Sequence, residues 1–301
     1  MRKIKLLFSG LLFASLLQAQ ETFPVNGVAD KREGCYAFTN ATIVQNAENT
    51  LQKASMVIRD GKIIAIGTDL TIPKDAVLVD CSGKWLYPSF IDIYADYGIA
   101  APQREAGGFG RGGFGQASQI NSNTKGAYGW NQAIKPETDA VKVFTTDASK
   151  AKSLRDIGFG AVLTHVKDGI ARGTGAFVTL ASDKDNLAII KERASAHYSF
   201  SKGTSGQSYP SSLMGSIALL RQTYLDAKWY KNSKPSDEGI NLSLEAWNAE
   251  QSLPQIFEAD DKWNDLRADR VGDEFGVQYI IKGGGNEYQR LDDITATHAP
   301  F

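Results

Sequence analysis

The chain has 301 residues, of which 42% are hydrophobic, enough for one or two domains with sizeable cores. Its 33 basic and 34 acidic side chains nearly cancel, which excludes the basic surface that nucleic-acid binding requires. We therefore expect a globular protein that has no nucleic-acid partner.

The amino terminus has the pattern of a secretory signal. Basic residues at positions 2, 3 and 5 precede an apolar run at 6–17, and Ala19 then offers a small residue at a cleavage point. The pattern predicts a signal peptide over 1–19, a lead segment over 20–34 and export to the periplasm or beyond. No later run approaches 18 apolar residues, so we expect no membrane span after cleavage.

Short alternating strands are predicted over residues 35–87. The runs "YAFTNATIV", "ASMVIRDGKIIAIG" and "AVLVDCSGKWLYP" are separated by turn signals, and Asp60-Gly61 tolerates the positive φ angles of a tight hairpin. This segment is expected to form part of a β-sandwich. The two cysteines of the chain, Cys35 and Cys81, could form a disulfide in an exported protein or lie as two separately buried thiols.

After Pro88 the pattern changes to buried strands that alternate with amphipathic helices, as in parallel sheets with helical crossovers. It predicts strands at 90–96, 160–166, 176–181, 255–260 and 277–282, and helices at 148–157, 211–230, 261–275 and 286–297. The fold class expected for residues 88–301 is an α/β protein with a (β/α)8 TIM-type barrel. Such barrels take about 250 residues, so the barrel is expected to be incomplete and the natural product longer.

Two glycine-rich segments have the composition of ligand-binding loops. In "AGGFGRGGFGQ", at 106–116, Gly108, Gly110 and Gly113 have a dinucleotide-binding spacing but lack a preceding strand and a following helix. We interpret the segment as a mobile loop at the barrel mouth and expect no bound cofactor there. The segment "IIKGGGNEY", at 280–288, could cradle an anion with backbone amides or simply make a sharp turn.

The segments "DGKIIAIG" and "VDCSGKWLYPSFID", followed by the patterns at 211–227 and 253–284, resemble the amidohydrolase superfamily, in particular its imidazolonepropionase-like and secreted members. The resemblance implies a parent protein that hydrolyses carbon–nitrogen bonds, in non-peptide or cyclic amides. It also implies one or two divalent metal ions, held by histidines at strand ends and an aspartate on the eighth strand, where metal activates water.

The positions that match the family's metal ligands carry other residues. The first-strand pair becomes Tyr94 and Asp96, the fifth-strand histidine becomes Glu258, and the sixth-strand histidine becomes Lys282. Asp96, Glu258 and Asp260 are candidate oxygen ligands for a hard divalent cation. The alternative is a salt-bridged interior, in which Lys282 pairs with Glu258 and takes the place of the cation.

His165 is a further site candidate because it ends a predicted strand and would face the barrel mouth. His197 and His298 are interpreted as structural. The pattern therefore favours an exported hydrolase whose present segment lacks the usual metal centre. The alternative is a catalytically silent barrel that acts as a scaffold or binding module. Its expected partner is either its own missing carboxyl-terminal portion or an adjacent amidohydrolase domain.

Overall fold

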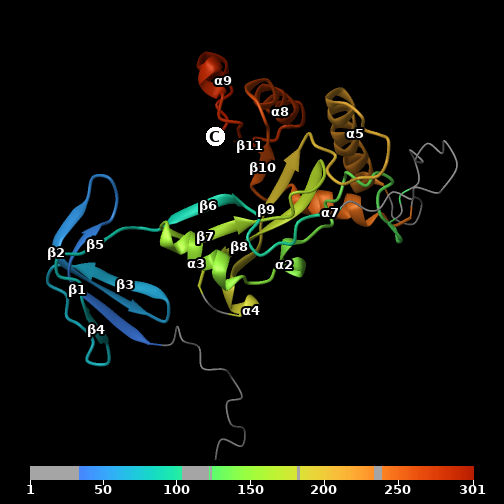
Figure 1. The fold of residues 1–301 in the computed structure, drawn as a ribbon. Coiled ribbons are helices and arrows are strands. Elements are labelled where there is room, and N and C mark those ends of the chain that lie inside the picture. Colours follow the sequence, from blue (N-terminus) through green and yellow to red (C-terminus); the bar gives the residue numbers. More distant parts are fainter. Residues whose placement is uncertain (1–33, 104–121, 123, 182–183, 234–238) are drawn as a thin grey trace, which may run out of the picture. The chain divides into compact units, whose positions relative to one another are not determined.

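The computed structural model describes residues 34–103, 122, 124–181, 184–233 and 239–301. The chain forms two compact units, Met1–Pro88 and Ser89–Phe301 (Figure 1). The expected signal peptide, most of the lead segment and the glycine-rich segment at 106–116 lie outside the described residues. Among the residues that are described, no helix is both long and apolar enough to span a bilayer.

The first unit contains one five-stranded sheet. Its strands are β1 (Cys35–Val44), β2 (Thr50–Arg59), β3 (Lys62–Gly67), β4 (Val77–Asp80) and β5 (Trp85–Leu86), in the order β3-β2-β1-β4, with β5 also paired to β1. Asp60 and Gly61 have φ angles of 51° and 74°, which confirms the predicted hairpin turn. All five strands join one sheet through β1 or its neighbours, and the expectation that this segment is part of a β-sandwich stays a prediction.

Cys35 and Cys81 are both buried and both free. Cys35 packs with Ala37 and Val57, whereas Cys81 packs in a different cluster with Ala41 and Ile43. The disulfide alternative is therefore wrong for this structure, since each thiol is used as a small apolar side chain in its own cluster.

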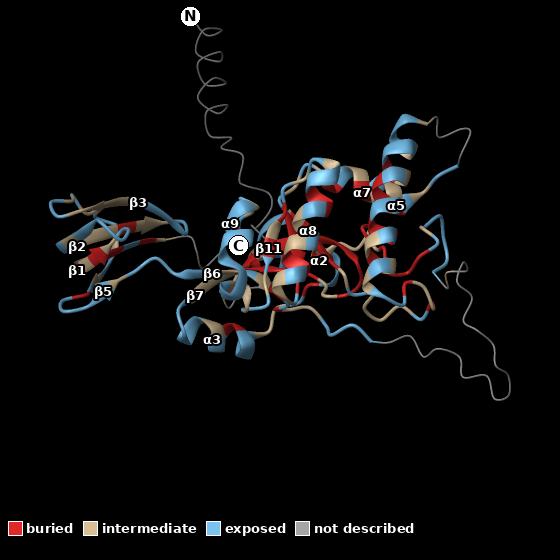
Figure 2. Ribbon diagram, turned by 90° about the horizontal axis from the view of Figure 1, so that it is seen from above, coloured by how far each residue is buried: buried red, intermediate tan, exposed pale blue. Residues whose placement is uncertain are grey.

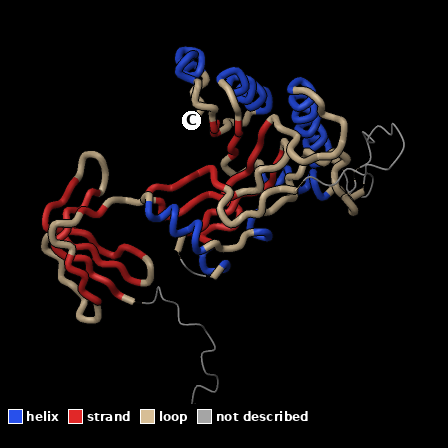
Figure 3. Tube along the Cα trace, viewed as in Figure 1, coloured by secondary structure: helices blue, strands red, loops and turns tan. Residues whose placement is uncertain are grey.

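The second unit is built on a six-stranded sheet in the order β11-β10-β9-β8-β7-β6 (Figures 1 and 3). The strands are β6 (Phe90–Ala95), β7 (Phe159–Thr164), β8 (Ala171–Thr179), β9 (Ile189–Ser199), β10 (Gln255–Glu258) and β11 (Ile280–Lys282). β6 is parallel to β7, and β9, β10 and β11 are parallel to one another. The five predicted strands are present, although the predicted strand at 176–181 covers only the end of β8.

The arrangement of β8 corrects the expectation of an all-parallel (β/α)8 barrel. β8 is antiparallel to both β7 and β9. Only residues 165–170 connect β7 to β8, and a link that short closes a hairpin but cannot make a helical crossover. β9 was not predicted, because its first half is exposed and rich in charge and only its second half is buried.

Helices cover the sheet of the second unit (Figure 3). They are α2 (Ala140–Val143), α3 (Ala148–Asp156), α4 (Asp185–Ala188), α5 (Leu213–Asn232), α7 (Leu242–Glu250), α8 (Lys262–Phe275) and α9 (Leu291–Ala296), with a 3-10 helix η1 (Glu287–Arg290) before α9. The four predicted helices are confirmed to within a few residues, and α2, α4 and α7 were not predicted. Side chains of Asp147, Ser212, Asn241 and Asp261 cap the amino termini of α3, α5, α7 and α8.

The largest apolar core of the second unit lies between β9, β10 and the helices α5, α7 and α8, where Figure 2 shows buried residues facing inward from exposed outer surfaces. Trp247 of α7 meets Tyr198 of β9 and Tyr224 of α5 edge-on, with ring centroids 5.4 and 4.8 Å apart. These contacts pack α7 between β9 and α5, two of the elements that line a cavity described below.

Candidate functional site

Two of the residues predicted from strand ends, Tyr94 of β6 and Glu258 of β10, meet at the guanidinium group of Arg172. Nη1 of Arg172 donates to the Tyr94 hydroxyl at 2.7 Å, and Nη2 lies 2.7 Å from Oε2 of Glu258. Nε of the same group donates to the Gly169 carbonyl at 3.1 Å, and only 4% of the Arg172 side chain is exposed. One buried cation therefore joins side chains from three strands, β6, β8 and β10.

This cluster fixes the protonation of its members. Burial raises the pKa of Glu258, but the charge of Arg172 and the hydrogen bonds around the carboxylate outweigh it and hold that pKa below its usual value. Burial raises the pKa of the Tyr94 hydroxyl well above its ordinary value, even though Arg172 acts in the opposite direction. At neutral pH the cluster thus contains an ionised carboxylate, a guanidinium and a neutral phenol.

Two lysines surround the same tyrosine ring. Nζ of Lys282 lies 4.0 Å from Oε1 of Glu258 and 5.5 Å from the centre of the Tyr94 ring. Nζ of Lys167 lies 4.6 Å from that ring centre and 3.6 Å from Oδ2 of Asp96. The expected pairing of Lys282 with Glu258 is therefore present at the limit of an ion pair, but Arg172 makes the shorter contact.

The three carboxylates considered as metal ligands are not brought together. Asp96 has a side chain that is 70% exposed and pairs with Lys167, while Glu258 pairs with Arg172. Asp260 is exposed and accepts a hydrogen bond from Asn264 of α8. Among the described residues, no three His, Cys, Asp or Glu side chains are placed to hold a metal ion. The residues present do not fit the divalent metal that the resemblance implies.

His165, which was expected to end a strand and face the barrel mouth, follows β7 directly, is fully buried and stacks on His197 of β9. Their ring centroids are 3.6 Å apart with an angle of 5° between the planes, and the Tyr94 ring lies 4.7 Å from His165. Nε2 of His197 is 2.8 Å from the Ser195 hydroxyl, while both ring nitrogens of His165 have no partner in the described part of the chain. Burial lowers the pKa of both imidazoles, so both are neutral at neutral pH.

The glycine-rich loop after β11 does not offer its amides to an external anion in this structure. The carboxylate of Glu287 accepts a hydrogen bond from the Gly285 amide at 3.0 Å. Glu287 therefore takes the position that a bound anion would use, and the sharp-turn interpretation of this loop fits better.

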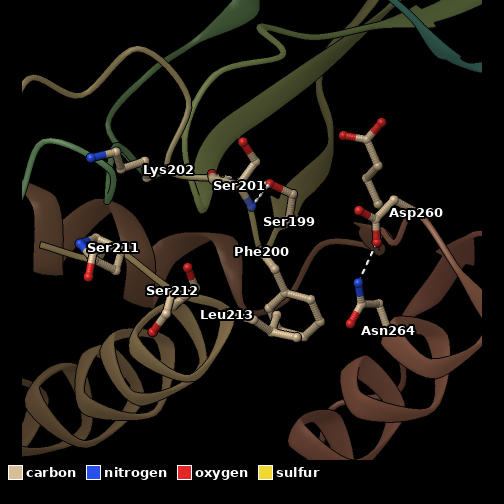
Figure 4. A pocket seen from close by; sticks show the side chains of 12 residues that line it. Ser199, Phe200, Ser201, Lys202, Ser211, Ser212, Leu213, Asp260 and Asn264 are labelled. Atoms are coloured by element: carbon tan, nitrogen blue, oxygen red, sulfur yellow. Dashed lines mark hydrogen bonds between the residues drawn. The ribbon is translucent and has the colours of Figure 1, made fainter.

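A cavity of about 540 Å³ opens at the carboxyl ends of β9 and β10 (Figure 4). Ser199 and Glu258 line it from the strand ends, and the first residues of α5 and α8 line it from the sides. Its wall is rich in hydroxyl groups, from Ser199, Ser201, Ser211, Ser212 and Ser216. Glu258 belongs both to this wall and to the Arg172 cluster, so the two features form one candidate site.

Arg172, His197 and the serines of the cavity wall were not predicted from the sequence. Arg172 lies in the part of β8 that precedes the predicted strand, and His197 lies in the strand that was missed. A usable signal for the cavity was the cluster of serines in "SYPSSLMGS", where Ser212 also caps the helix that begins at Leu213.

No protein-family model matches the sequence, and no curated protein sequence matches it. Among solved structures, an amidohydrolase from Thermotoga maritima MSB8 is similar at a TM-score of 0.64 and 22% identity, over 84% of this chain and 66% of that one. A crystal structure of another amidohydrolase has a TM-score of 0.38 and 13% identity, over 88% of this chain and 65% of that one. A prolidase crystallised with N-methylphosphonate-L-proline has a TM-score of 0.37 and 11% identity, over 84% and 61%.

Of these three similarities, only the first is high enough to support an argument, and it concerns the fold. The chain has the fold of an amidohydrolase structure, a mixed α/β unit together with a separate sheet. The chain spans less than two thirds of the length of each of the three proteins.

Proposed function

We propose that the protein is an exported hydrolase of the amidohydrolase type that acts on carbon–nitrogen bonds. In this proposal, the described segment binds the substrate and lacks the family's divalent metal. The observation that carries the proposal is the cavity at the carboxyl ends of β9 and β10, bordered by the ionised Glu258. In open and closed α/β sheets, ligands bind at this end of parallel strands, and the similarity in fold supports the same end here.

The residues of the cluster support binding at this position. Arg172 binds the Glu258 carboxylate at Oε2, Lys282 lies 4.0 Å from Oε1, and the same carboxylate borders the cavity. An ionised carboxylate in a partly enclosed cavity accepts hydrogen bonds from amide or amino groups more strongly than a neutral acceptor does. We therefore assign Glu258 the role of contacting the nitrogen side of a substrate.

A second candidate function is a binding module without catalytic activity. It is favoured by the guanidinium of Arg172, which already neutralises the carboxylate that a metal would otherwise bind. In this case the hydrolytic groups would come from a further portion of the protein or from an adjacent amidohydrolase domain.

The two functions are separated by measuring zinc content and hydrolysis on the same preparations. The 301-residue chain and the natural secreted product are stripped of metal, reconstituted with zinc, and assayed against N-acyl amino acids and cyclic amides. The proposal expects no stoichiometric zinc on the 301-residue chain, and hydrolysis by the natural product. Hydrolysis by the natural product that Glu258→Gln leaves unchanged would favour the binding module, because its hydrolytic groups would lie outside the described segment. One zinc ion per 301-residue chain, lost in Glu258→Gln, would contradict the metal-free segment.

A further inference from the structure

We infer that the carboxylates of Asp265 and Glu287 bind one calcium ion, where the first turn of α8 meets the loop after β11. This site uses neither Glu258 nor the cavity beside it, and it goes beyond the proposed function. It rests on a fully buried carboxylate that has no donor and no cation beside it, and on a second carboxylate that the backbone holds next to the first.

Asp265 lies in the first turn of α8, and its side chain is 0% exposed. Both of its carboxyl oxygens are buried and have no hydrogen-bond partner in the part of the chain that the structure describes. Removing a carboxylate from water is unfavourable unless hydrogen-bond donors or a cation replace the water. Asp265 therefore marks a position at which the described residues supply no counter-charge.

The carboxylate of Glu287 lies beside that of Asp265. The two carboxyl groups are within hydrogen-bonding distance of each other, but two ionised carboxylates offer acceptors alone. Only a shared proton or a cation makes this contact favourable. The Gly285 amide donates to Oε1 of Glu287 at 3.0 Å and fixes the side chain there. A Cβ atom at Gly283 would collide with the same oxygen, so the loop closes around this carboxylate only because Gly283 has no side chain.

Backbone contacts hold the two segments together. β10 and β11 are paired in parallel, and the Ala259 amide donates to the Lys282 carbonyl at 3.0 Å where the two strands end. The Lys262 amide donates to the Asn286 side chain at 2.9 Å, which ties the start of α8 to the loop after β11. The chain thus keeps the two carboxylates together against their repulsion, as a preformed cation site requires.

The surroundings of the pair are negative. Burial raises the pKa of Asp265 most, and the charges of Glu287, Asp261 and Asp260 raise it further. The basic side chains of the neighbouring elements contact other partners among the described residues: Lys262 contacts Gln289, Arg267 contacts Asn264, Lys282 contacts Glu258, and Arg290 contacts Asp293. A bound cation would supply the positive charge that these side chains give elsewhere.

Calcium is the cation that suits these donors. Carboxylate oxygens favour calcium or magnesium over transition metals. Because Asp265 has no exposed surface, only a species of ionic size fits beside its oxygens. No third His, Cys, Asp or Glu side chain in the described ranges converges on the pair, so water and neutral oxygens complete the coordination. Calcium accepts such an irregular shell more readily than magnesium does, and we expect a dissociation constant of about 0.1–1 mM.

Calorimetry on the chelator-treated 301-residue chain tests the site. We expect one calcium ion per chain, and binding that is weakened at least about tenfold in Asp265→Asn and in Glu287→Gln, because each variant removes one charged ligand and keeps the side-chain shape. Asp273→Asn is the matched control, since it removes an exposed carboxylate from the same helix. No calcium binding by the wild-type chain at about 10 mM would overturn the inference and leave a shared proton between the two carboxyl groups. Equal weakening by Asp273→Asn and Asp265→Asn would overturn it as well.

Terbium luminescence locates the ion. Terbium replaces calcium at oxygen sites and emits when a nearby tryptophan is excited, and Trp263 precedes Asp265 by two residues in the same turn of α8. We expect calcium to displace the terbium and abolish the emission. Trp263→Phe should remove most of the terbium emission and leave the calorimetric affinity for calcium unchanged. Emission that persists in Trp263→Phe would place the ion beside another tryptophan and overturn the assignment to Asp265 and Glu287.

Discussion

The imidazole rings of His165 and His197 stack face to face inside the sheet of the second unit, 3.6 Å between centroids. Two protonated rings at this separation would repel strongly in a buried environment, so the pair is stable only when both rings are neutral. The pair borders Tyr94, with the nearer ring, His165, at 4.7 Å, and thereby supports the tyrosine that Arg172 contacts.

The stack predicts a specific loss of stability in acid. Burial lowers the pKa of His197 from 6.5 to about 3, so the unfolded chain binds a proton that the folded chain does not. The contribution of His197 to the free energy of unfolding is fully present above pH 6.5. It is lost as the pH falls toward the pKa that this imidazole has in the folded protein. His165→Phe keeps an aromatic ring on His197 and removes one titrating group. Urea unfolding over this pH range should give a shallower decline for His165→Phe than for the wild-type chain; equal slopes would contradict the prediction.

For Glu250 of α7 we expect the opposite pH dependence of the free energy of unfolding. It is 1% exposed, both of its carboxyl oxygens lack partners in the described chain, and burial raises its pKa from 4.5 to about 9. Its contribution to stability is fully present below pH 4.5 and declines as the pH rises toward the folded pKa.

Glu250→Gln should therefore match the wild type in acid and exceed it by about 2 kcal/mol at neutral pH. The measurement is the free energy of unfolding at both pH values. Glu245→Gln, on the same helix, is a control that should change little, because this residue is exposed. A constant difference between Glu250→Gln and the wild type at all pH values would show that the effect is not due to ionisation.

Arg172 should be the most costly single residue of the cluster to replace. Arg172→Met leaves the Glu258 carboxylate without its closest cation, and breaking a buried ion pair costs about 3–5 kcal/mol. Arg172→Lys should recover little, because one ammonium group cannot contact Tyr94 and Glu258 with the geometry of a planar guanidinium. A double variant, Arg172→Met with Glu258→Gln, should be more stable than Arg172→Met alone. Additive losses in the double variant, measured by urea unfolding, would contradict the coupling.

Export is tested at the amino terminus. The pattern of basic, apolar and small residues before Gln20 predicts that the secreted protein begins at Gln20. The protein is purified after secretion by its natural host, and its amino terminus is sequenced. The first three residues should be Gln-Glu-Thr. Recovery of the protein in the cytoplasm with residues 1–19 still attached would contradict this prediction.

Local sequence was sufficient for several elements. The hairpin at Asp60-Gly61 follows from residues that tolerate positive φ angles, and α3, α5 and α8 follow from capping side chains placed before amphipathic runs. The resemblance drawn from short segments also pointed to a fold that the similarity to a solved amidohydrolase structure supports. These features depend on interactions between residues that are near one another in the chain.

Which residues meet at the candidate site was decided by the tertiary structure. Tyr94, Arg172 and Glu258 are far apart in the sequence, and they meet because β8 turns back against β7 and brings its arginine between β6 and β10. The same reversal places His197 beside His165. A short link between strands can be read from the sequence, but the partner of a buried charge cannot. That partner is set by which strands pair, because burial requires a counter-charge from whichever side chain the pairing brings within reach.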